Sequence, residues 1–77
     1  MPTTKKKEPL DNYQKFQRAL EINSLNLPEM AEITGYSVNT LYGLSMPDRT
    51  STRAREVTDR FLEFMNMRLL AKGLKTV

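Results

Sequence analysis

Residues 27–46 constrain the fold of this chain most, because a helix-ending signal and a helix-starting signal lie almost side by side there. Gly35 follows an apolar stretch, and glycine readily takes the left-handed conformation that ends many helices. Ser37 carries a hydroxyl that can cap the first turn of another helix. Ala31 is small where two helices joined by so short a turn would approach each other. We therefore predict two short helices that cross at a wide angle, with the turn at Gly35.

A capping pattern and an apolar stripe predict another helix before this pair. Asp11 and Gln14 have the spacing of a capping box, in which each side chain bonds the backbone N–H of the other residue. Tyr13, Phe16 and Leu20 follow at helical spacing. We expect a helix of about 11 residues that starts at Asp11.

The remaining signals complete an all-α expectation. Pro28 suits the first turn of the second helix, where its missing N–H would be unpaired in any case. After a loop over residues 48–51, residues 52–72 are predicted to form a long last helix that ends at Gly73. At 1.5 Å per residue this helix would span roughly 30 Å. The predicted fold is a small all-α domain of four helices, with a helix-turn-helix and a long C-terminal helix.

The chain has 77 residues, enough for one domain, which we place at residues 10–73. Residues 1–9 are expected to be a disordered basic arm that carries Lys5, Lys6 and Lys7, and residues 74–77 a tail. Cysteine and histidine are absent, which argues against the usual zinc sites and against Cys–His or Ser–His nucleophiles, so we expect no metal and no cofactor. No apolar run approaches the ~18 residues of a membrane span, and we expect no membrane contact and a cytoplasmic protein.

The last predicted helix carries more apolar side chains than one small core face requires. A domain of this size buries only about 60% of the surface that its unfolded chain exposes, so association would add stability. One edge of the helix is expected to pack on the other helices and the opposite edge on a second copy. The expected dimer interface consists of Phe61, Leu62, Met65 and Leu69. The alternative is that a single core absorbs the whole helix.

The two-helix segment, residues 27–46, resembles the helix-turn-helix of the lambda-repressor-like and Cro-like transcriptional regulators. The residues that carry the resemblance are Ala31, Gly35, Ser37, Thr40 and Leu41, flanked by Leu27, Met30 and Leu44. The resemblance implies sequence-specific binding of double-stranded DNA by a homodimer, with the third helix in the major groove and a palindromic operator as the site. A repressor that acts by occupying a promoter is the expected regulator.

The resemblance also implies which residues meet DNA. At the start and on the outward side of the third helix, the expected base contacts are Ser37, Val38, Asn39, Thr40 and Tyr42. The expected phosphate contacts, which add the charge that this helix lacks, are Arg49, Arg53, Arg55, Lys5, Lys6 and Lys7. The net charge of +3 is compatible with such a partner.

Other readings of the same residues stay open. Residues 38–46 contain no Arg, Lys or Gln, so the third helix could instead bind a protein such as RNA polymerase. Asn39 and Tyr42 could be merely solvated, and Arg53 and Arg55 could simply face water or pair with Asp59. An enzyme is disfavoured, because the sequence offers no nucleophile–base pair and no metal-ligand cluster. The acidic pair Glu29 and Glu32 lies at a helix start, where it is expected to stabilise the positive helix end.

Overall fold

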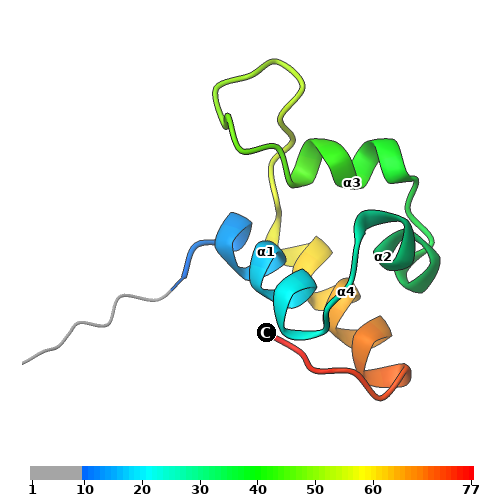
Figure 1. Ribbon diagram of the computed structural model, residues 1–77. Helices are drawn as coiled ribbons and strands as arrows, with labels where there is room; N and C mark the ends of the chain where they lie inside the picture. Colours follow the sequence, from blue (N-terminus) through cyan, green and yellow to red (C-terminus); the bar gives the residue numbers. More distant parts are fainter. Residues whose placement is uncertain (1–9) are drawn as a thin grey trace, which may run out of the picture.

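The computed structural model describes residues 10–77 and contains four α-helices in this part of the chain. They are α1 (Asn12–Ile22), α2 (Leu27–Thr34), α3 (Val38–Leu44) and α4 (Asp59–Ala71). The predicted all-α class with four helices is confirmed, and no strand occurs within residues 10–77. In Figure 1, α3 lies across one end of the molecule, and α1, α2 and α4 lie together beneath it. The basic arm expected at residues 1–9 lies outside the described residues.

Polar side chains set the start of each helix. The predicted capping box of α1 is present, since Asp11 Oδ1 accepts from the Gln14 N–H at 2.7 Å and Gln14 Oε1 accepts from the Asp11 N–H at 3.0 Å. A second capping box, which the sequence analysis missed, joins Asn26 and Glu29 at the start of α2, with bonds of 2.8 and 2.9 Å. Ser37 caps α3, as predicted. These caps satisfy backbone donors that a helix start leaves free.

The turn between α2 and α3 is made by Gly35, as predicted. Its φ of +81° lies in the left-handed region, and its N–H donates to Ala31 O at 2.8 Å. The next residue, Tyr36, stacks edge-on against Phe61 of α4 with 5.2 Å between ring centroids. The Arg68 Nε also donates to Ile33 O at 2.9 Å, near the C-terminal end of α2. Both contacts tie the turn to α4 and fix the angle at which α3 leaves it.

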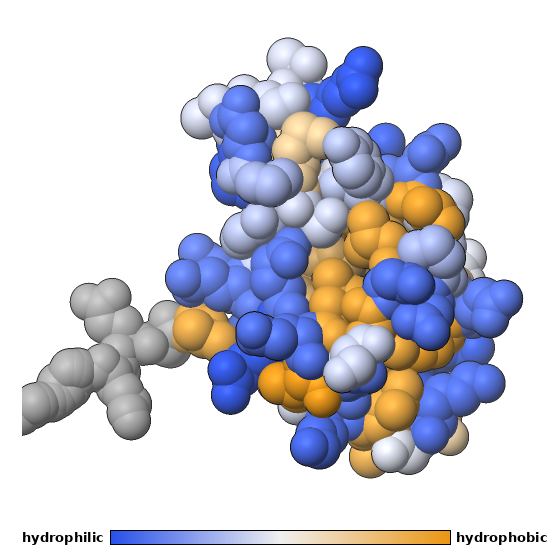
Figure 2. All heavy atoms as spheres, viewed as in Figure 1, coloured by the Kyte–Doolittle hydropathy of each residue, from blue (hydrophilic) through white to orange (hydrophobic). Residues whose placement is uncertain are grey.

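The core lies between the helices and draws on all four of them. Its fully buried large side chains are Phe16, Met30, Leu41, Met65 and Leu69. Phe16 and Phe61 meet edge to face with 5.5 Å between centroids, an arrangement that aromatic pairs favour. In Figure 2, apolar atoms gather between α1 and α2, whereas the end that carries α3 and the following loop is mostly polar.

The last helix is shorter than predicted, because it begins at Asp59 rather than at residue 52. Thr58 is its N-cap, and the Thr58 Oγ1 accepts from the Phe61 N–H at 3.0 Å. Residues 45–58 form an irregular connection, which we call the returning loop. Val57 is buried in the core from this loop and not from the helix. Val57 continues the apolar spacing of the helix, and for this reason the predicted start of the last helix was placed too early.

The residues predicted to form a dimer interface are buried within one chain. The exposed fractions are 5% for Phe61, 6% for Leu62 and 0% for both Met65 and Leu69. That assignment was wrong, because these side chains form the inner face of α4 and are not available to a second copy. The uncovered apolar residues of α4 are instead Phe64, Met67 and Leu70, exposed by 37%, 69% and 70%.

The residues expected as a tail, 74–77, are bound to the helices by two asparagine side chains. Asn23 Nδ2 donates to Lys75 O, and Asn23 Oδ1 accepts from the Lys75 N–H, both at 2.9 Å. Asn66 makes the same pair of bonds with the backbone of Val77, at 2.8 and 3.0 Å. Each side-chain amide thus bonds both the N–H and the C=O of one residue of the segment. Leu74 and Val77 also pack against the core.

Candidate nucleic-acid interface

Helix α3 has an inner face in the core and an outer face open to solvent. Leu41 and Leu44 are 0% and 4% exposed and anchor the helix on the core. Val38 and Tyr42 are 43% and 55% exposed, and Asn39 is exposed beside them. Because α3 lies at one end of the molecule, no other helix of residues 10–77 covers this outer face (Figure 1). Three of the five predicted base-contacting residues are therefore free to meet a partner.

The other two predicted base-contacting residues, Ser37 and Thr40, bond each other. Ser37 Oγ accepts from the Thr40 N–H at 3.1 Å and donates to Thr40 Oγ1 at 2.9 Å. Ser37 is exposed and Thr40 is half-buried. The Ser37 hydroxyl is therefore occupied as the cap of α3, and the Thr40 hydroxyl is bonded to it.

The returning loop folds back over the C-terminal half of α3. The Arg55 N–H donates to Gly43 O at 2.9 Å. Gly43 permits this approach, since a Cβ at this position would lie 2.9 Å from Arg53 O and 2.9 Å from Arg55 Cγ. Glycine stabilises a helix less than alanine does. At residue 43, however, the loop backbone crosses the helix where an alanine side chain would lie.

The crossing leaves a hollow of about 440 Å³ between α3 and the returning loop. Asn39 and Tyr42 line it from the helix, and residues 52–55 line it from the loop. Two of the predicted phosphate-contacting residues, Arg53 and Arg55, are thereby brought next to two of the predicted base-contacting residues. Thr52 also lines the hollow, and the sequence analysis missed it because residue 52 was placed at the start of a helix.

The charges around this hollow are predominantly basic. Arg53 and Arg55 are both exposed, and neither guanidinium has a hydrogen bond to a residue in the range 10–77. The sequence left open a pairing of Arg53 or Arg55 with Asp59; among residues 10–77, the side-chain partner of Asp59 is instead Asn12, whose Nδ2 donates to Asp59 Oδ1 at 2.8 Å. These two arginines can therefore neutralise an anion that approaches α3.

The returning loop also carries a carboxylate, Asp48. Its Oδ1 accepts from Thr50 Oγ1 at 2.6 Å and from the Thr50 N–H at 3.0 Å. The Thr50 hydroxyl, and after it the Thr50 N–H, hold the pKa of Asp48 below its ordinary value. This carboxylate therefore stays charged in mild acid and organises the loop turn at residues 48–51.

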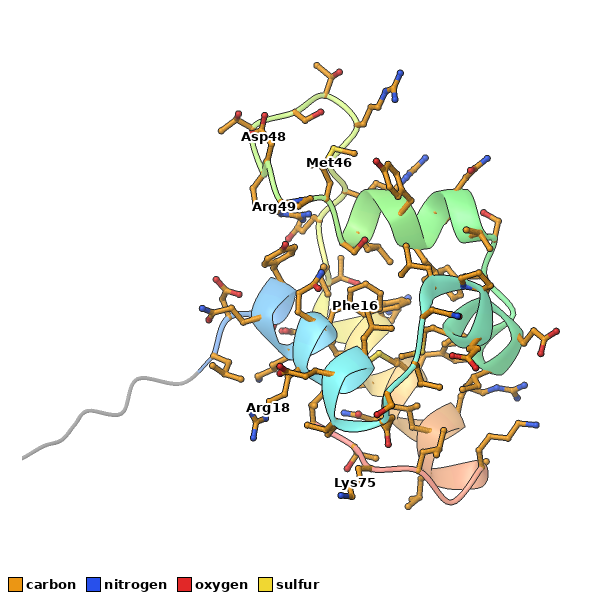
Figure 3. All side chains as sticks on the ribbon, in the orientation of Figure 1. Phe16, Arg18, Met46, Asp48, Arg49 and Lys75 are labelled. Carbon is orange, nitrogen blue, oxygen red and sulfur yellow. The ribbon has the colours of Figure 1, made fainter. Side chains whose placement is uncertain are left out.

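Arg49, the third arginine predicted to bind phosphate, is turned toward the protein. Its Nη1 donates to the carbonyl oxygens of Gly43, Leu44 and Met46 at 3.3, 3.1 and 3.0 Å. Its Nη2 donates to Arg55 O. Figure 3 shows Arg49 between the end of α3 and α1. The guanidinium that was predicted to bind phosphate therefore caps the C-terminal end of α3.

The remaining predicted phosphate contacts, Lys5, Lys6 and Lys7, lie outside the described residues. Within residues 10–77, no three acidic, histidine or cysteine side chains converge as a metal site would require. No helix in that range combines the length and apolar character needed to cross a bilayer. No protein-family model, curated protein or solved structure matches this chain.

Proposed function

We propose that the chain binds double-stranded DNA in a sequence-specific manner, with the outer face of α3 in the major groove. The observation that carries the proposal is the exposure of Val38, Asn39 and Tyr42 on a helix that a sharp turn at Gly35 sets apart from α2. The major groove, about 12 Å wide, admits one α-helix. A helix that lies across one end of a small domain can enter it without a clash from the other helices.

The side chains of the outer face divide into different roles. The Asn39 amide can bond the N6 and N7 positions of an adenine, the pairing that this side chain favours in the major groove. Val38 offers a methyl surface to a thymine methyl group. Tyr42 offers both a ring and a hydroxyl. The neighbouring guanidinium groups of Arg53 and Arg55 bind the phosphates that border the groove.

A homodimer would give this short helix the specificity that it lacks alone. Two copies related by a two-fold axis read two half-sites about one helical turn of DNA apart, so a palindromic operator is the expected target. The exposed apolar residues Phe64, Met67 and Leu70 of α4 are the available surface for association. The chain would then act as a cytoplasmic transcriptional regulator, in the first instance a repressor that occupies a promoter, similar to the lambda-repressor-like and Cro-like regulators.

One observation favours a second function, the binding of a protein such as RNA polymerase. The outer face of α3 presents Val38, Asn39 and Tyr42 and no charged side chain of its own. Ionic strength distinguishes the two functions. Binding through several phosphates weakens steeply with added salt, whereas an apolar protein contact does not.

The direct experiment is selection of bound sites from a random pool of duplex DNA. We expect enrichment of a symmetric sequence. With that sequence, Asn39→Ala should relax preference at one base position in each half-site. Arg53→Ala should weaken binding similarly on all sequences and reduce the slope of log K against log salt by about 0.9. The absence of any enriched sequence would exclude the proposal, and identical effects of the two variants would exclude this division of roles.

A further inference from the structure

Helix α3 is short, and its C-terminal end is where external support is most needed. It has seven residues, and an isolated helix of two turns is not stable in water. Its last carbonyl oxygens have no partners within the helix. At this end, the Nη1 of Arg49 donates to three carbonyl oxygens, those of Gly43, Leu44 and Met46. A positive charge there also interacts favourably with the negative end of the helix dipole.

The same guanidinium joins the end of α3 to two other segments. Its Nη2 donates to Arg55 O, on the limb of the returning loop that leads toward α4. Its carbon Cζ lies 4.4 Å from the centre of the Tyr13 ring of α1, a cation–π distance. Helix α1 adds weaker polar contacts of its own, since Tyr13 Oη and Gln17 Nε2 donate to Ser45 O at 3.4 and 3.3 Å. One side chain therefore links α1, the end of α3 and both limbs of the loop.

The position of the loop decides where Arg53 and Arg55 lie. Both backbone polar groups of Arg55 are hydrogen-bonded. Its C=O accepts from Arg49 Nη2, and its N–H donates to Gly43 O. This backbone sets the start of the Arg55 side chain, and residue 53 is close by along the chain. Both side chains border the hollow that Asn39 and Tyr42 line. The spacing between phosphate-binding and base-reading groups is thus fixed through Arg49.

We infer that Arg49 is a positioning residue that clasps the returning loop to α3 and so aligns Arg53 and Arg55 with the outer face of the helix. Lysine cannot replace it, because an ammonium group lacks the planar fork that reaches carbonyl oxygens on two segments at once. The clasp is a property of the free protein. Its effect on DNA binding rests on the proposed function above.

The test of the clasp is amide hydrogen exchange, followed by NMR in the free protein. Arg49→Lys and Arg49→Gln should both speed exchange of the Arg55 amide about tenfold or more, because local opening of the loop becomes easier. The matched control is Arg53→Gln, which changes an arginine of the same loop whose guanidinium has no hydrogen bond within residues 10–77, and it should leave the Arg55 amide unchanged. Amides of Met65 and Leu69 in the core should exchange at the original rate in all three variants.

Two results would overturn the clasp. One is an unchanged Arg55 amide in Arg49→Lys, which would mean that any positive charge suffices. The other is equal acceleration at Arg55 and at the core amides, which would mean that Arg49 acts on global stability and not on the loop. Tyr13→Leu provides a second route to the same answer, since loss of the ring under the guanidinium should speed exchange at Arg55 to a smaller extent.

Affinity for the selected duplex then tests the positioning role separately. Arg49→Lys keeps the charge, and it should nevertheless weaken binding about tenfold while Arg53→Gln lowers the salt slope by about 0.9. Wild-type affinity in Arg49→Lys would contradict the positioning role even if the clasp is present. If the wild-type protein binds no duplex, the proposed function fails, while the exchange experiment still decides whether the clasp exists.

Discussion

At the scale of single residues, two glycines shape the candidate interface for different reasons. Gly35 adopts a left-handed φ of +81°, and nothing lies within 4 Å of the position of a Cβ there, so only its backbone conformation requires glycine. Gly43 has ordinary helical backbone, and the crossing backbone of Arg53 is what leaves no space for a side chain. The sequence made the first role predictable from helix-ending patterns. The second depends on a loop whose path no local pattern reveals.

Substitution of Gly35 by alanine should therefore cost backbone strain alone. We expect Gly35→Ala to lower the free energy of unfolding by about 1 kcal/mol, as measured by urea denaturation. Tyr36→Leu, one residue further along, removes the aromatic contact with Phe61 and leaves Gly35 in place. Comparison of the two variants therefore separates the cost of backbone strain at residue 35 from the cost of lost packing at the turn. A Gly35→Ala protein as stable as the wild type would contradict the left-handed turn.

Substitution of Gly43 should reverse the usual effect of alanine in a helix. Within a helix, glycine to alanine normally stabilises by about 1 kcal/mol. Here the new Cβ would meet Arg53 O at 2.9 Å, so we expect Gly43→Ala to lower the stability and to shift the NMR signals of residues 53–55. An increase in the melting temperature with no change in those signals would show that the loop does not cross the helix at this point.

At the scale of elements, side-chain amides and short polar contacts hold the segments that are neither helix nor core. Residues 74–77 are an example, since Asn23 and Asn66 bond their backbone from α1 and α4. The sequence indicates a free tail there, because no sequence pattern marks an asparagine whose side chain bonds the backbone of a distant segment. The start of α4 was misplaced for a related reason: the apolar Val57 continues the helical pattern past the true cap, Thr58.

Loss of one of these amides should be felt in stability. We expect Asn23→Ala to lower the free energy of unfolding by about 1 to 2 kcal/mol, since two hydrogen bonds to Lys75 and one from Asn23 Nδ2 to Ala19 O disappear. The matched control is Asn39→Ala, an exposed asparagine of α3, which should change stability by less than about 0.5 kcal/mol. Equal losses in the two variants, measured by urea denaturation, would be inconsistent with a bound C-terminal segment.

The returning loop should show a pH signature of its own. The pKa of Asp48 lies below its ordinary value because of the Thr50 hydroxyl first and the Thr50 N–H second. A carboxyl with a depressed pKa stabilises the fold above the pKa of the unfolded chain, and this contribution is lost as the pH falls through the folded pKa. Thr50→Val should raise the pKa of Asp48 toward its ordinary value in an NMR titration of the carboxyl carbon. Thr52→Val, the control, should leave it unchanged, and an equal rise there would refute the assignment.

At the scale of the whole molecule, the sequence predicted the class and the order of the helices, and it misassigned which side of α4 is uncovered. Phe61, Leu62, Met65 and Leu69 were expected to meet a second copy, but a single core absorbs them. Helical spacing gives the apolar arc of a helix, yet it does not say which part of the arc faces the rest of the domain. Similarly, Arg49 could not be separated from Arg53 and Arg55 before its carbonyl partners were known.

Dimerisation of the chain should depend on the exposed apolar residues of α4. We expect the wild-type chain to dimerise at tens of micromolar in sedimentation equilibrium and the double variant Met67→Glu, Leu70→Glu to remain monomeric. Val38→Glu places the same acidic group at an exposed apolar position of α3 and should leave the dimer intact. A wild-type chain that is strictly monomeric at these concentrations would contradict the proposed homodimer.

The most direct test of the central claim, that the outer face of α3 binds DNA, is NMR shift mapping with a duplex from the selection. We predict that the backbone amides with the largest shifts are those of Val38, Asn39, Tyr42 and Arg53, and that added salt reverses the shifts. Shifts that cluster around Met67 and Leu70 while α3 stays unchanged, or no shifts at millimolar duplex, would contradict DNA binding by the outer face of α3.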